Sequence, residues 1–357
     1  MKPSSSEPTV EPRVLRSTCA RILRSVGVPD LDAGVIADSL VEADRRGTHS
    51  HGVMRLPLYV QAVRTGGIDP AANMEWIRSQ GATAVLDAGT GFGQVAMVHA
   101  LEKARELVSA HATAVIAVRG SSHYGAGAYW TSQLSRDGLV AFLISTTGAS
   151  VTPFGGTEKI LGTNPLTISF PTGGEEPVVL DMASSNGAYG RIVEASNERV
   201  QIPAGWAVDS NGLPTTDPAA ALSGALLPFG GHKGSGLSVL LELLAGPLAG
   251  GKLASETTDM WADPAVPMDT GHLLWVVDPV GLQGNERPVQ RAAKFQNRLR
   301  QTVPAAGSRE VLSPGDVEHR NARAHTELMP LPASTLDALT ALAEEFGTLD
   351  PLAANFR

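Results

Sequence analysis

Apolar residues recur at every third or fourth position in several stretches of the chain, which is the spacing of an amphipathic helix. Residues 14–26 show this spacing clearly, and Gly27 follows them where a helix-ending glycine is expected. The spacing and the flanking Gly, Pro and Asp residues predict helices over residues 14–26, 30–46, 52–63, 94–110, 126–136, 235–246, 289–302 and 335–346. The chain is therefore expected to be helical near both ends.

Short apolar runs alternate with these helices from residue 83 onward, and such runs between turn signals are typical of buried strands. Strands are expected over residues 83–88, 113–118, 139–145, 160–171, 177–182 and 272–278. Residues 196–228 are rich in Pro, Gly, Asp and Asn, so an irregular insertion is expected there. Because turns flank the strands as often as helices do, the pattern predicts a mixed α/β sheet rather than a doubly wound one.

The composition is that of an ordinary globular protein. Of the 357 residues, 43% are hydrophobic and 18% are charged. This length fits two domains, or one large body with insertions, and allows a sizeable core. The net charge of −8, without a long basic run, argues against a nucleic-acid partner.

Neither a membrane span nor a secretory leader is expected. The longest apolar stretch, residues 237–249, is shorter than the roughly 20 residues that cross a bilayer. The beginning of the chain lacks the apolar core of a signal peptide, and residues 1–13 are expected to be disordered. Cys19 is the single cysteine, so no internal disulfide can form, which fits a reducing cytoplasm.

The stretch EADRRGTHSHGVMRLPLY, residues 42–59, concentrates the side chains best suited to chemistry. Histidine titrates near neutral pH, so His51 could exchange a proton with a substrate oxygen. If a helix starts at Gly52, Arg55 lies one turn beyond His51, and its guanidinium fork suits a carboxylate. Two alternatives remain: His49 and His51 could bind a metal as in some hydrolases, or all three could be surface residues.

Two glycine-rich stretches are candidates for binding phosphate. In DAGTGFGQ, a third glycine of G-x-G-x-x-G would fall at Gln94, so a tight turn from strand to helix is favoured over a Rossmann loop. GGHKGSG, residues 230–236, does not have Walker spacing. It combines Lys233 with free backbone N–H groups at a helix start, which favours a bound anion over a flexible loop.

Three polar residues at strand ends are weaker candidates. His123 lies in the loop RGSSHYG after an apolar strand, where either a site residue or a surface residue is found. Asp181 ends the strand VVLDM, where it is either a cap for Ser184 and Ser185 or a functional carboxylate. Asn164 precedes a proline in the turn GTNP and is held extended by that proline.

Several of these motifs together are similar to those of one known family. ADRRGTHSHGVMRL resembles the A-D-x-R-G-x-x-S-H-G-x-x-R stretch of the malate/L-lactate dehydrogenase family, which is distinct from the Rossmann-fold malate and lactate dehydrogenases. The family includes sulfolactate, ureidoglycolate and 2,3-diketogulonate enzymes and reductases of cyclic imino acids. Its other motifs resemble, in the same order, SSHYGAG, VTPFGGTEKILGTNPL, VVLDMASS, GGHKGSGLSVLLELLAGPLAG and LSPGDVEHR, so the similarity covers residues 14–345.

The resemblance implies an α/β protein with a non-Rossmann NAD(P)-binding fold. Its sheet would be mixed, largely antiparallel and flanked by helices, with a helical domain formed by both chain ends. The helical domain would comprise residues 14–75 and 300–357, and the catalytic sheet domain residues 76–299. The cofactor would be NAD or NADP, and the protein would be a homodimer with its sites near the subunit interface. These implications agree with the failed dinucleotide motif.

The resemblance also assigns roles by position. His51 is implied to be the proton donor and acceptor, His123 a second catalytic histidine and Arg55 the carboxylate anchor, while His49 and Asn164 are further candidates for substrate contact. The residues implied to line the cofactor are Ser145, Asp181, Met182, Ala183, Lys233, Gly234, Gly315 and Asp316. The sequence departs from the family at His49, at Tyr189-Gly190-Arg191 and at His232, which bears on the identity of the substrate.

The expected function is therefore hydride transfer between NAD(P) and a small 2-hydroxy acid or 2-oxo acid, with the cofactor supplying the hydride chemistry. A close alternative keeps the fold and reduces the C=N bond of a cyclic imino acid that carries a carboxylate. Two more distant hypotheses are a metal-dependent hydrolase that uses His49 and His51, and a carboxylate-binding protein without catalysis. No metal is expected in the hypothesis that we favour.

Overall fold

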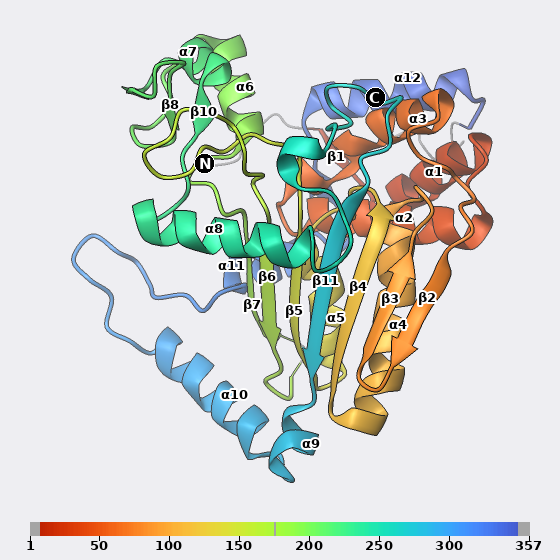
Figure 1. The fold of residues 1–357 in the computed structure, drawn as a ribbon, viewed down its shortest axis with the longest axis vertical. Coiled ribbons are helices and arrows are strands. Elements are labelled where there is room, and N and C mark those ends of the chain that lie inside the picture. Colours follow the sequence, from red (N-terminus) through yellow and green to blue (C-terminus); the bar gives the residue numbers. More distant parts are fainter. Residues whose placement is uncertain (1–7, 175, 349–357) are drawn as a thin grey trace.

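The fold is organised around one sheet in a computed structural model, which describes residues 8–174 and 176–348. Seven described strands form this sheet: β2 (Glu75–Gln80), β3 (Thr83–Asp87), β4 (Thr113–Ser121), β5 (Val140–Ser145), β6 (Leu166–Phe170), β7 (Val178–Met182) and β11 (Thr270–Val277). Their order is β2-β3-β4-β11-β5-β6-β7, and only β3 and β4 are parallel neighbours among them (Figure 1). The predicted mixed, largely antiparallel sheet is confirmed.

Helices cover the two faces of this sheet unequally (Figure 1). On one face lie α4 (Gly93–His111) and α5 (Gly127–Arg136), and small residues of α4 such as Ala96 and Ala100 are fully buried in the core there. The other face is crossed by α8 (Gly231–Ala245) near one end of the strands. On that face Trp275 of β11 stacks on Phe142 of β5 and remains 45% exposed, so part of this face carries no helix.

Both ends of the described chain meet in a second hydrophobic core. It is formed by α1 (Pro12–Ser25), α2 (Asp30–Arg45), α3 (Leu56–Thr65) and α12 (Ala333–Glu345). Beside them, β1 (Thr9–Val10) pairs with β12 (Met329–Pro330). Met260 and Met268, which come from the long segment before β11, are buried in the same core and tie the sheet to the helices.

The insertion expected to be irregular is instead a small folded unit. It contains α6 (Tyr189–Glu198), β8 (Ala207–Val208), β9 (Pro214–Thr215), α7 (Pro218–Ser223) and β10 (Ala225–Leu226). The short strand β8 pairs with β9 on one side and β10 on the other, and a separate apolar cluster is buried among these strands and the two helices. Its elements are too short to show a clear hydrophobic period, which is why the sequence pattern did not reveal them.

Other boundaries also differ from the sequence prediction. Residues 9–13, expected to be disordered, form β1 and the start of α1, while residues 1–7 lie outside the described part. The strand expected over residues 160–171 extends only from Leu166 to Phe170. β2 was not expected, because it is a polar edge strand with most side chains exposed. The remaining helices are α9 (Pro279–Gln283), α10 (Arg287–Arg300) and α11 (Asp316–Ala324).

Candidate active site

A buried carboxylate at the end of α2 fixes the histidine-rich turns that follow it. Asp44 is 2% exposed, and its Oδ2 accepts a hydrogen bond from the backbone N–H of Val53 at 2.7 Å. Its Oδ1 lies 2.8 Å from Nδ1 of His49. The chain around these contacts forms two short 3-10 turns, η1 (His49–His51) and η2 (Val53–Arg55). Asp44 therefore holds both turns, and the side chain of His49 faces it.

The glycine between the turns determines how closely they pass this carboxylate. A Cβ atom on Gly52 would lie 2.2 Å from Oδ1 of Asp44, which is far inside contact distance. The helix predicted over residues 52–63 is present but starts later, because Gly52 is extended, η2 follows it, and α3 begins only at Leu56. His51 and Arg55 consequently lie on consecutive 3-10 turns rather than one helical turn apart.

The guanidinium of Arg55 is held so that one edge stays available. Its Nε donates to the carbonyl oxygen of Ser50 at 2.6 Å, and its Cζ lies 4.6 Å from the ring centroid of Trp261. The Nη atoms have no hydrogen-bond partner among the described residues. Burial lowers the pKa of Arg55, and Tyr59 and Asp259 oppose that shift, so the group stays charged. Fixed at Nε and on one face, it presents a fork that suits a carboxylate.

The two catalytic candidates lie together. The rings of His51 and His123 stack with centroids 5.5 Å apart, although the residues are far apart in sequence. Nδ1 of His123 lies 2.6 Å from the hydroxyl of Tyr59, which also accepts a hydrogen bond from Nε2 of Gln94 at 3.0 Å. The edge of Trp261 meets the His123 ring at 5.6 Å between centroids. The structure thus brings His51, His123 and Arg55 into one cluster.

Burial and neighbouring charges keep both histidines neutral near pH 7. Burial lowers the pKa of His51, the carboxylate of Asp181 raises it, and Arg55 lowers it again. Burial lowers the pKa of His123 well below its usual value, and His51, Arg55 and His272 add to this effect. Only His51 has a nearby carboxylate that favours its protonated form, so it is the better proton carrier of the two.

Ser145 belongs to a buried polar chain behind the cluster. Its Oγ lies 2.8 Å from Nδ1 of His272, whose Nε2 lies 2.8 Å from Oγ of Ser121. Burial lowers the pKa of His272 to about 4, so this histidine is neutral. The ring of Tyr124 packs on His272 at 4.8 Å, and the buried hydroxyl of Tyr124 has no partner among the described residues. A buried donor of this kind is costly unless a ligand accepts its hydrogen bond.

Asp181 links the cluster to the end of β7. Its Oδ2 accepts from the backbone N–H of Ala128 at 2.8 Å, in the first turn of α5, and its Oδ1 accepts from Oγ1 of Thr167 at 2.7 Å. The carboxylate therefore caps α5, and the interpretation of Asp181 as a cap for Ser184 and Ser185 is wrong. It makes no described hydrogen bond to a histidine and acts on His51 through its charge alone. Met182 and Ala183 follow it at the strand end, where Ala183 is exposed.

The glycine run with Lys233 forms the first turn of α8. Gly230 and Gly231 have positive φ angles, and a Cβ on Gly234 would overlap the carbonyl oxygen of Phe229. Lys233 is exposed and makes no ion pair with the described residues. The tight turn explains the glycines, and the anion-binding role remains a prediction.

Gly315 and Asp316 lie beside the first half of β7. The backbone N–H of Val179 donates to the carbonyl oxygen of Pro314 at 3.1 Å, and Gly315 has a φ of +93°. The carboxylate of Asp316 is engaged by Nε of Arg300 at 3.1 Å and Nη2 at 2.5 Å. Desolvation raises the pKa of Asp316, but the hydrogen bonds to its carboxylate outweigh this effect and hold the pKa below its usual value. Both residues thus lie along the strand that carries Asp181, and their role toward a cofactor remains a prediction.

Asn164 is placed by buried partners. Its Oδ1 accepts from the backbone N–H of Thr147 at 3.2 Å, and its Nδ2 donates to Oε2 of Glu242 at 2.5 Å. Both polar atoms are therefore occupied, and the residue is 0% exposed. Its candidate role in substrate contact stays a prediction, and these contacts assign it a place in joining α8 to the loop before β6.

The glycines of DAGTGFGQ form the strand-to-helix turn that was favoured over a dinucleotide loop. The backbone N–H groups of Ala88 and Thr90 donate to the carbonyl oxygens of Arg119 and Gly120 at 2.9 and 2.8 Å. A Cβ on Gly93 would lie 2.3 Å from the carbonyl oxygen of Ser122. The turn thus packs against the loop that leads to His123 and does not present these N–H groups to a ligand.

Several residues of the cluster were not found by sequence reasoning. Tyr59 and Gln94 occur at helical spacing with apolar core residues, so the pattern gave them only a packing role. Trp261 lies in a segment without periodicity. Tyr124 and His272 lie among apolar residues of a loop and a strand, so the sequence pattern did not single them out either. The only signal for any of them was sequence proximity, since Tyr59 ends the stretch of residues 42–59 and Tyr124 follows His123.

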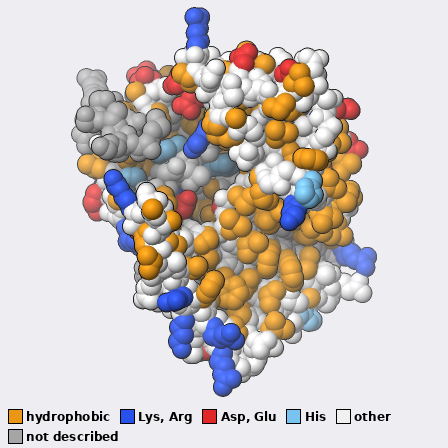
Figure 2. Space-filling model, turned by 90° about the vertical axis from the view of Figure 1, so that its left-hand side faces the viewer, with side chains coloured by type: hydrophobic (Ala, Val, Ile, Leu, Met, Phe, Trp, Pro, Cys, Tyr) orange, Lys and Arg blue, Asp and Glu red, His pale blue; other side chains and the backbone are white. Residues whose placement is uncertain are grey.

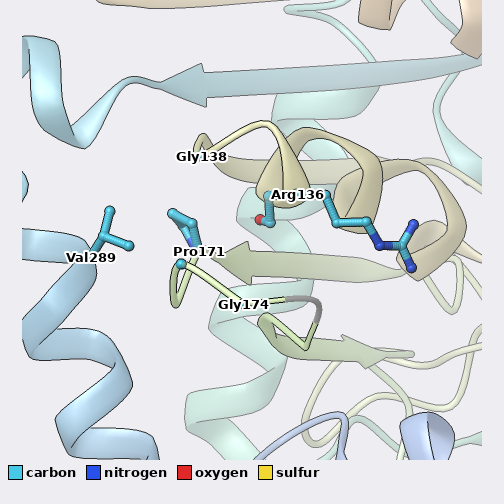
Figure 3. A pocket seen from close by; sticks show the side chains of 7 residues that line it. Arg136, Gly138, Pro171, Gly174 and Val289 are labelled. Atoms are coloured by element: carbon cyan, nitrogen blue, oxygen red, sulfur yellow. The ribbon is translucent and has the colours of Figure 1, made fainter.

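A cavity of about 350 Å³ lies away from this cluster (Figure 3). It is lined by Ser135, Arg136 and Gly138, by Pro171, Gly173 and Gly174 of the turn after β6, and by Val289 of α10. Arg136 is its one charged residue, and the Arg136 side chain extends away from Pro171 and Val289 in Figure 3. Its lining residues include no carboxylate and no imidazole, and the Ser135 hydroxyl is bonded to the carbonyl oxygen of Leu139 and to Oγ of Ser169. The cavity is therefore not the candidate active site.

The His49–His51 pair does not have the geometry of a metal site. His49 faces Asp44, whereas His51 stacks on His123. Within residues 8–174 and 176–348, no three His, Cys, Asp or Glu side chains are grouped as metal ligands would be. In the same residues, no helix is both long and apolar enough to span a membrane.

The structure brings a guanidinium fork and two stacked imidazoles together beside a mixed sheet that is not a Rossmann fold. The family model for malate/L-lactate dehydrogenase matches residues 10–340. The chain therefore belongs to the malate/L-lactate dehydrogenase family and is an NAD(P)-dependent oxidoreductase, as the resemblance implied.

Individual relatives agree with this family. The L-sulfolactate dehydrogenase of Methanocaldococcus jannaschii is 35% identical over 91% of this chain and 94% of that protein. A Pseudomonas putida Delta(1)-pyrroline-2-carboxylate/Delta(1)-piperideine-2-carboxylate reductase is 37% identical over 80% and 84% of the two chains. The solved structure of sulfolactate dehydrogenase from M. jannaschii matches with a TM-score of 0.89 and 34% identity, covering 95% of this chain and 97% of that one.

Proposed function

We propose that this chain catalyses reversible hydride transfer between NAD(P) and a small 2-hydroxy acid or 2-oxo acid. The observation that carries the proposal is the cluster of Arg55, His51 and His123, in which a guanidinium fork lies beside two stacked imidazoles. Arg55 would bind the carboxylate of the acid, which fixes the position of the neighbouring carbon and oxygen. The relatives that act on hydroxy acids support the same substrate class.

The residues around the cluster fit a nicotinamide cofactor. The unpartnered buried hydroxyl of Tyr124 is a donor that needs an acceptor, and it lies close enough to Asp181 for that charge to affect its pKa. Tyr124 and Ser145 would contact the cofactor near the histidines, and Asp181, Met182 and Ala183 would line it along the end of β7. We assign Lys233, Gly234, Gly315 and Asp316 to its more distant parts. When bound, the cofactor supplies or accepts the hydride, which no side chain can do.

The protein supplies the proton and holds the substrate. In reduction, His51 as imidazolium donates a proton to the developing alkoxide, and in oxidation the neutral imidazole removes it from the hydroxyl group. Asp181 stabilises the imidazolium through its charge, and Arg55 keeps the acid in one orientation. His123, stacked on His51, would make a second hydrogen bond to the same oxygen.

The test of the reaction class is absorbance at 340 nm with NADH and with NADPH against a panel of 2-oxo acids. Turnover with any of them supports the proposal, and the pattern names the cofactor and the acid together. Failure of every compound, combined with no change in protein fluorescence on adding either cofactor, would contradict it.

A second candidate keeps the same site and reduces the C=N bond of a cyclic imino acid. The specific observation in its favour is the P. putida reductase at 37% identity. Asp259 supports it as well, because an acid near Arg55 suits a substrate whose carboxylate accompanies a cationic C=N group. Adding cyclic imino acids to the 340 nm panel separates the two, since the preferred class should give the higher kcat/KM.

The pH dependence of the reaction should report the charge of Asp181. Oxidation needs neutral His51, so kcat/KM for a hydroxy acid should rise with pH through a His51 pKa that lies below 6.5. Asp181 raises this pKa, so Asp181→Asn should move the rise to lower pH. Thr167→Val removes a hydrogen bond to Asp181 without changing its charge and should leave the rise in place. If the rise in kcat/KM of Asp181→Asn stays at the wild-type pH or moves to higher pH, this role of Asp181 is contradicted.

Substrate affinity should depend on the fork of Arg55. In Arg55→Lys the bidentate contact is lost, and because a charge-assisted hydrogen bond is worth about 1.5–3 kcal/mol, KM should rise about 10- to 100-fold with a smaller change in kcat. Arg64→Lys is a matched control, since Arg64 lies at the same 4.6 Å over the ring of Phe346 but outside the cluster. Steady-state kinetics measure both, and an unchanged KM in Arg55→Lys would show that another residue anchors the acid.

We also propose that the protein is a homodimer, as the family resemblance implied, and works in a reducing cytoplasm. Figure 2 shows hydrophobic side chains gathered over one broad face of the molecule. Exposed hydrophobic residues occur along α8 and on the open side of the sheet: Val239, Leu240, Leu243, Leu244, Leu248, Leu180 and Trp275. A surface of this extent is typical of an interface. Analytical ultracentrifugation should give twice the mass of the chain, and Leu240→Glu should lower it, whereas a monomer mass at micromolar concentration would contradict the proposal.

A further inference from the structure

A buried tyrosine and a buried glutamine lie behind the second histidine of the cluster. Tyr59 on α3 and Gln94 on α4 are both 0% exposed, and neither was a candidate in the sequence. Nε2 of Gln94 donates to the hydroxyl of Tyr59 at 3.0 Å, and that hydroxyl lies 2.6 Å from Nδ1 of His123. Three side chains from different parts of the chain therefore form one hydrogen-bonded row that ends at His123.

The row has a direction. The Gln94 amide is oriented with Nε2, which can only donate, toward the Tyr59 oxygen, and its Oε1 is buried without a partner among the described residues. The Tyr59 oxygen therefore accepts from Gln94, and its single proton points to His123. Nδ1 of His123 must then accept, which places the proton of the neutral imidazole on Nε2. Nε2 has no hydrogen-bond partner among the described residues. His123 thus presents an N–H donor on the side of its ring away from Tyr59.

The surroundings keep this arrangement neutral. The groups that face His123 are His51 on η1, Arg55 on η2, Tyr59 on α3 and His272 on β11, and none of them carries a negative charge. Burial raises the pKa of Tyr59 to about 12, so its hydroxyl keeps the proton that it donates. His51 differs, because its Nδ1 contacts the exposed hydroxyl of Ser50 at 2.9 Å, which can either donate or accept.

We propose that Tyr59 and Gln94 are positioning residues that fix the Nε2–H tautomer of His123. His123 then donates a hydrogen bond to the substrate oxygen, and His51 alone exchanges a proton with it. This division of roles rests on the proposed function, whereas the tautomer of His123 does not. A fixed donor that faces the developing negative charge lowers the barrier without having to reorient during the reaction.

The direct test is the nitrogen NMR spectrum of the histidine rings in the full-length, uniformly ¹⁵N-labelled protein, with His123→Gln used to identify the His123 signals. The wild type should show His123 protonated at Nε2 and bare at Nδ1. In Gln94→Glu the carboxylate accepts from Tyr59, so the tyrosine oxygen must accept from His123 and the proton should move to Nδ1. In Tyr59→Phe, which removes only the hydroxyl, both tautomers should be populated.

Gln94→Met has nearly the same volume as glutamine but removes the donor that makes the Tyr59 oxygen accept. Tyr59 can then either donate to His123 or accept from it, so both tautomers should be populated. Tyr129→Phe removes a hydroxyl that donates to Asp38 outside the cluster, and as the matched control it should leave the tautomer as in the wild type. Gln94→Glu buries a new carboxylate, and where that variant does not fold, Tyr59→Phe decides the question alone. A wild-type His123 with its proton on Nδ1, or a tautomer that is the same in Tyr59→Phe as in the wild type, would overturn the proposal.

The kinetics add a second readout. Tyr59→Phe should lower kcat about tenfold with little change in KM, and Gln94→Glu about 100-fold, since removal of one oxyanion donor typically costs about 10²–10³ in kcat. Tyr129→Phe should stay within about threefold of the wild type, below the tenfold effect that 1.36 kcal/mol corresponds to. The expected tautomers without turnover of any acid would leave the positioning role intact and contradict the proposed function. Turnover of an acid together with a His123 proton on Nδ1 would support the proposed function and contradict the positioning role of Tyr59 and Gln94.

Discussion

Replacing His51 by asparagine should lower kcat by about 10²–10⁴, which is the usual contribution of a positioned acid or base. Asparagine keeps a polar side chain of similar size but cannot exchange a proton near neutral pH. The variant should also lose the dependence on pH that His51 causes in the wild type, because no other group in the cluster takes over the titration. Steady-state rates between pH 5 and 9 in both directions measure the two effects together.

A histidine outside the cluster provides the control for this variant. His111 ends α4 and is exposed, so His111→Asn should leave both kcat and the pH profile unchanged. His123→Gln should reduce kcat but keep the pH dependence, because in our assignment it donates a hydrogen bond and does not titrate. A variant His51→Asn with near-wild-type kcat would show that another residue, with His123 first among them, carries the proton.

The parts of the site that could be predicted from the sequence are those where chemistry is concentrated in one stretch. His51 and Arg55 stand four residues apart in a segment with an unusual concentration of charged and titratable side chains, so local reasoning identified them. Pattern reasoning had no means to place His123 against His51, because the contact joins a turn after α2 to a loop after β4. The family resemblance supplied that pairing, and the stacked rings are consistent with it.

The supporting residues could not be predicted, for a physical reason. Tyr59 and Gln94 occupy core-facing helix positions, where a period analysis counts them with apolar residues and says nothing about their hydrogen bonds. The helix expected over residues 52–63 starts later than expected, because a tertiary contact with the carboxylate of Asp44 holds the segment before Leu56 in short turns. The insertion at residues 196–228 was underestimated for a related reason, since its small core is assembled from elements of two to ten residues.

Gly52→Ala should be the most damaging change outside the catalytic side chains themselves. The backbone angles of Gly52, φ −86° and ψ −160°, suit any residue, so the whole effect comes from contact with Asp44. The new methyl group would lie 2.2 Å from a carboxylate oxygen and would displace it from His49 and from the N–H of Val53. Leaving a buried acceptor without its hydrogen bonds costs about 1–3 kcal/mol in stability. A shift of about 1 Å in His51 and Arg55 would lower kcat/KM about 100-fold.

Two comparisons show whether this contact is the cause. Gly34 in α2 has open space around its Cα, so Gly34→Ala should instead stabilise the protein by about 0.5–1 kcal/mol in urea unfolding. In an Asp44→Ala background the clash no longer exists, so adding Gly52→Ala should cost much less than it does in the wild type, which is the non-additivity expected of residues in contact. Additive effects of the two changes would mean that Gly52 matters for a reason other than Asp44. Because both turns depend on this carboxylate, the same cycle also measures how far catalysis relies on a residue that touches no substrate.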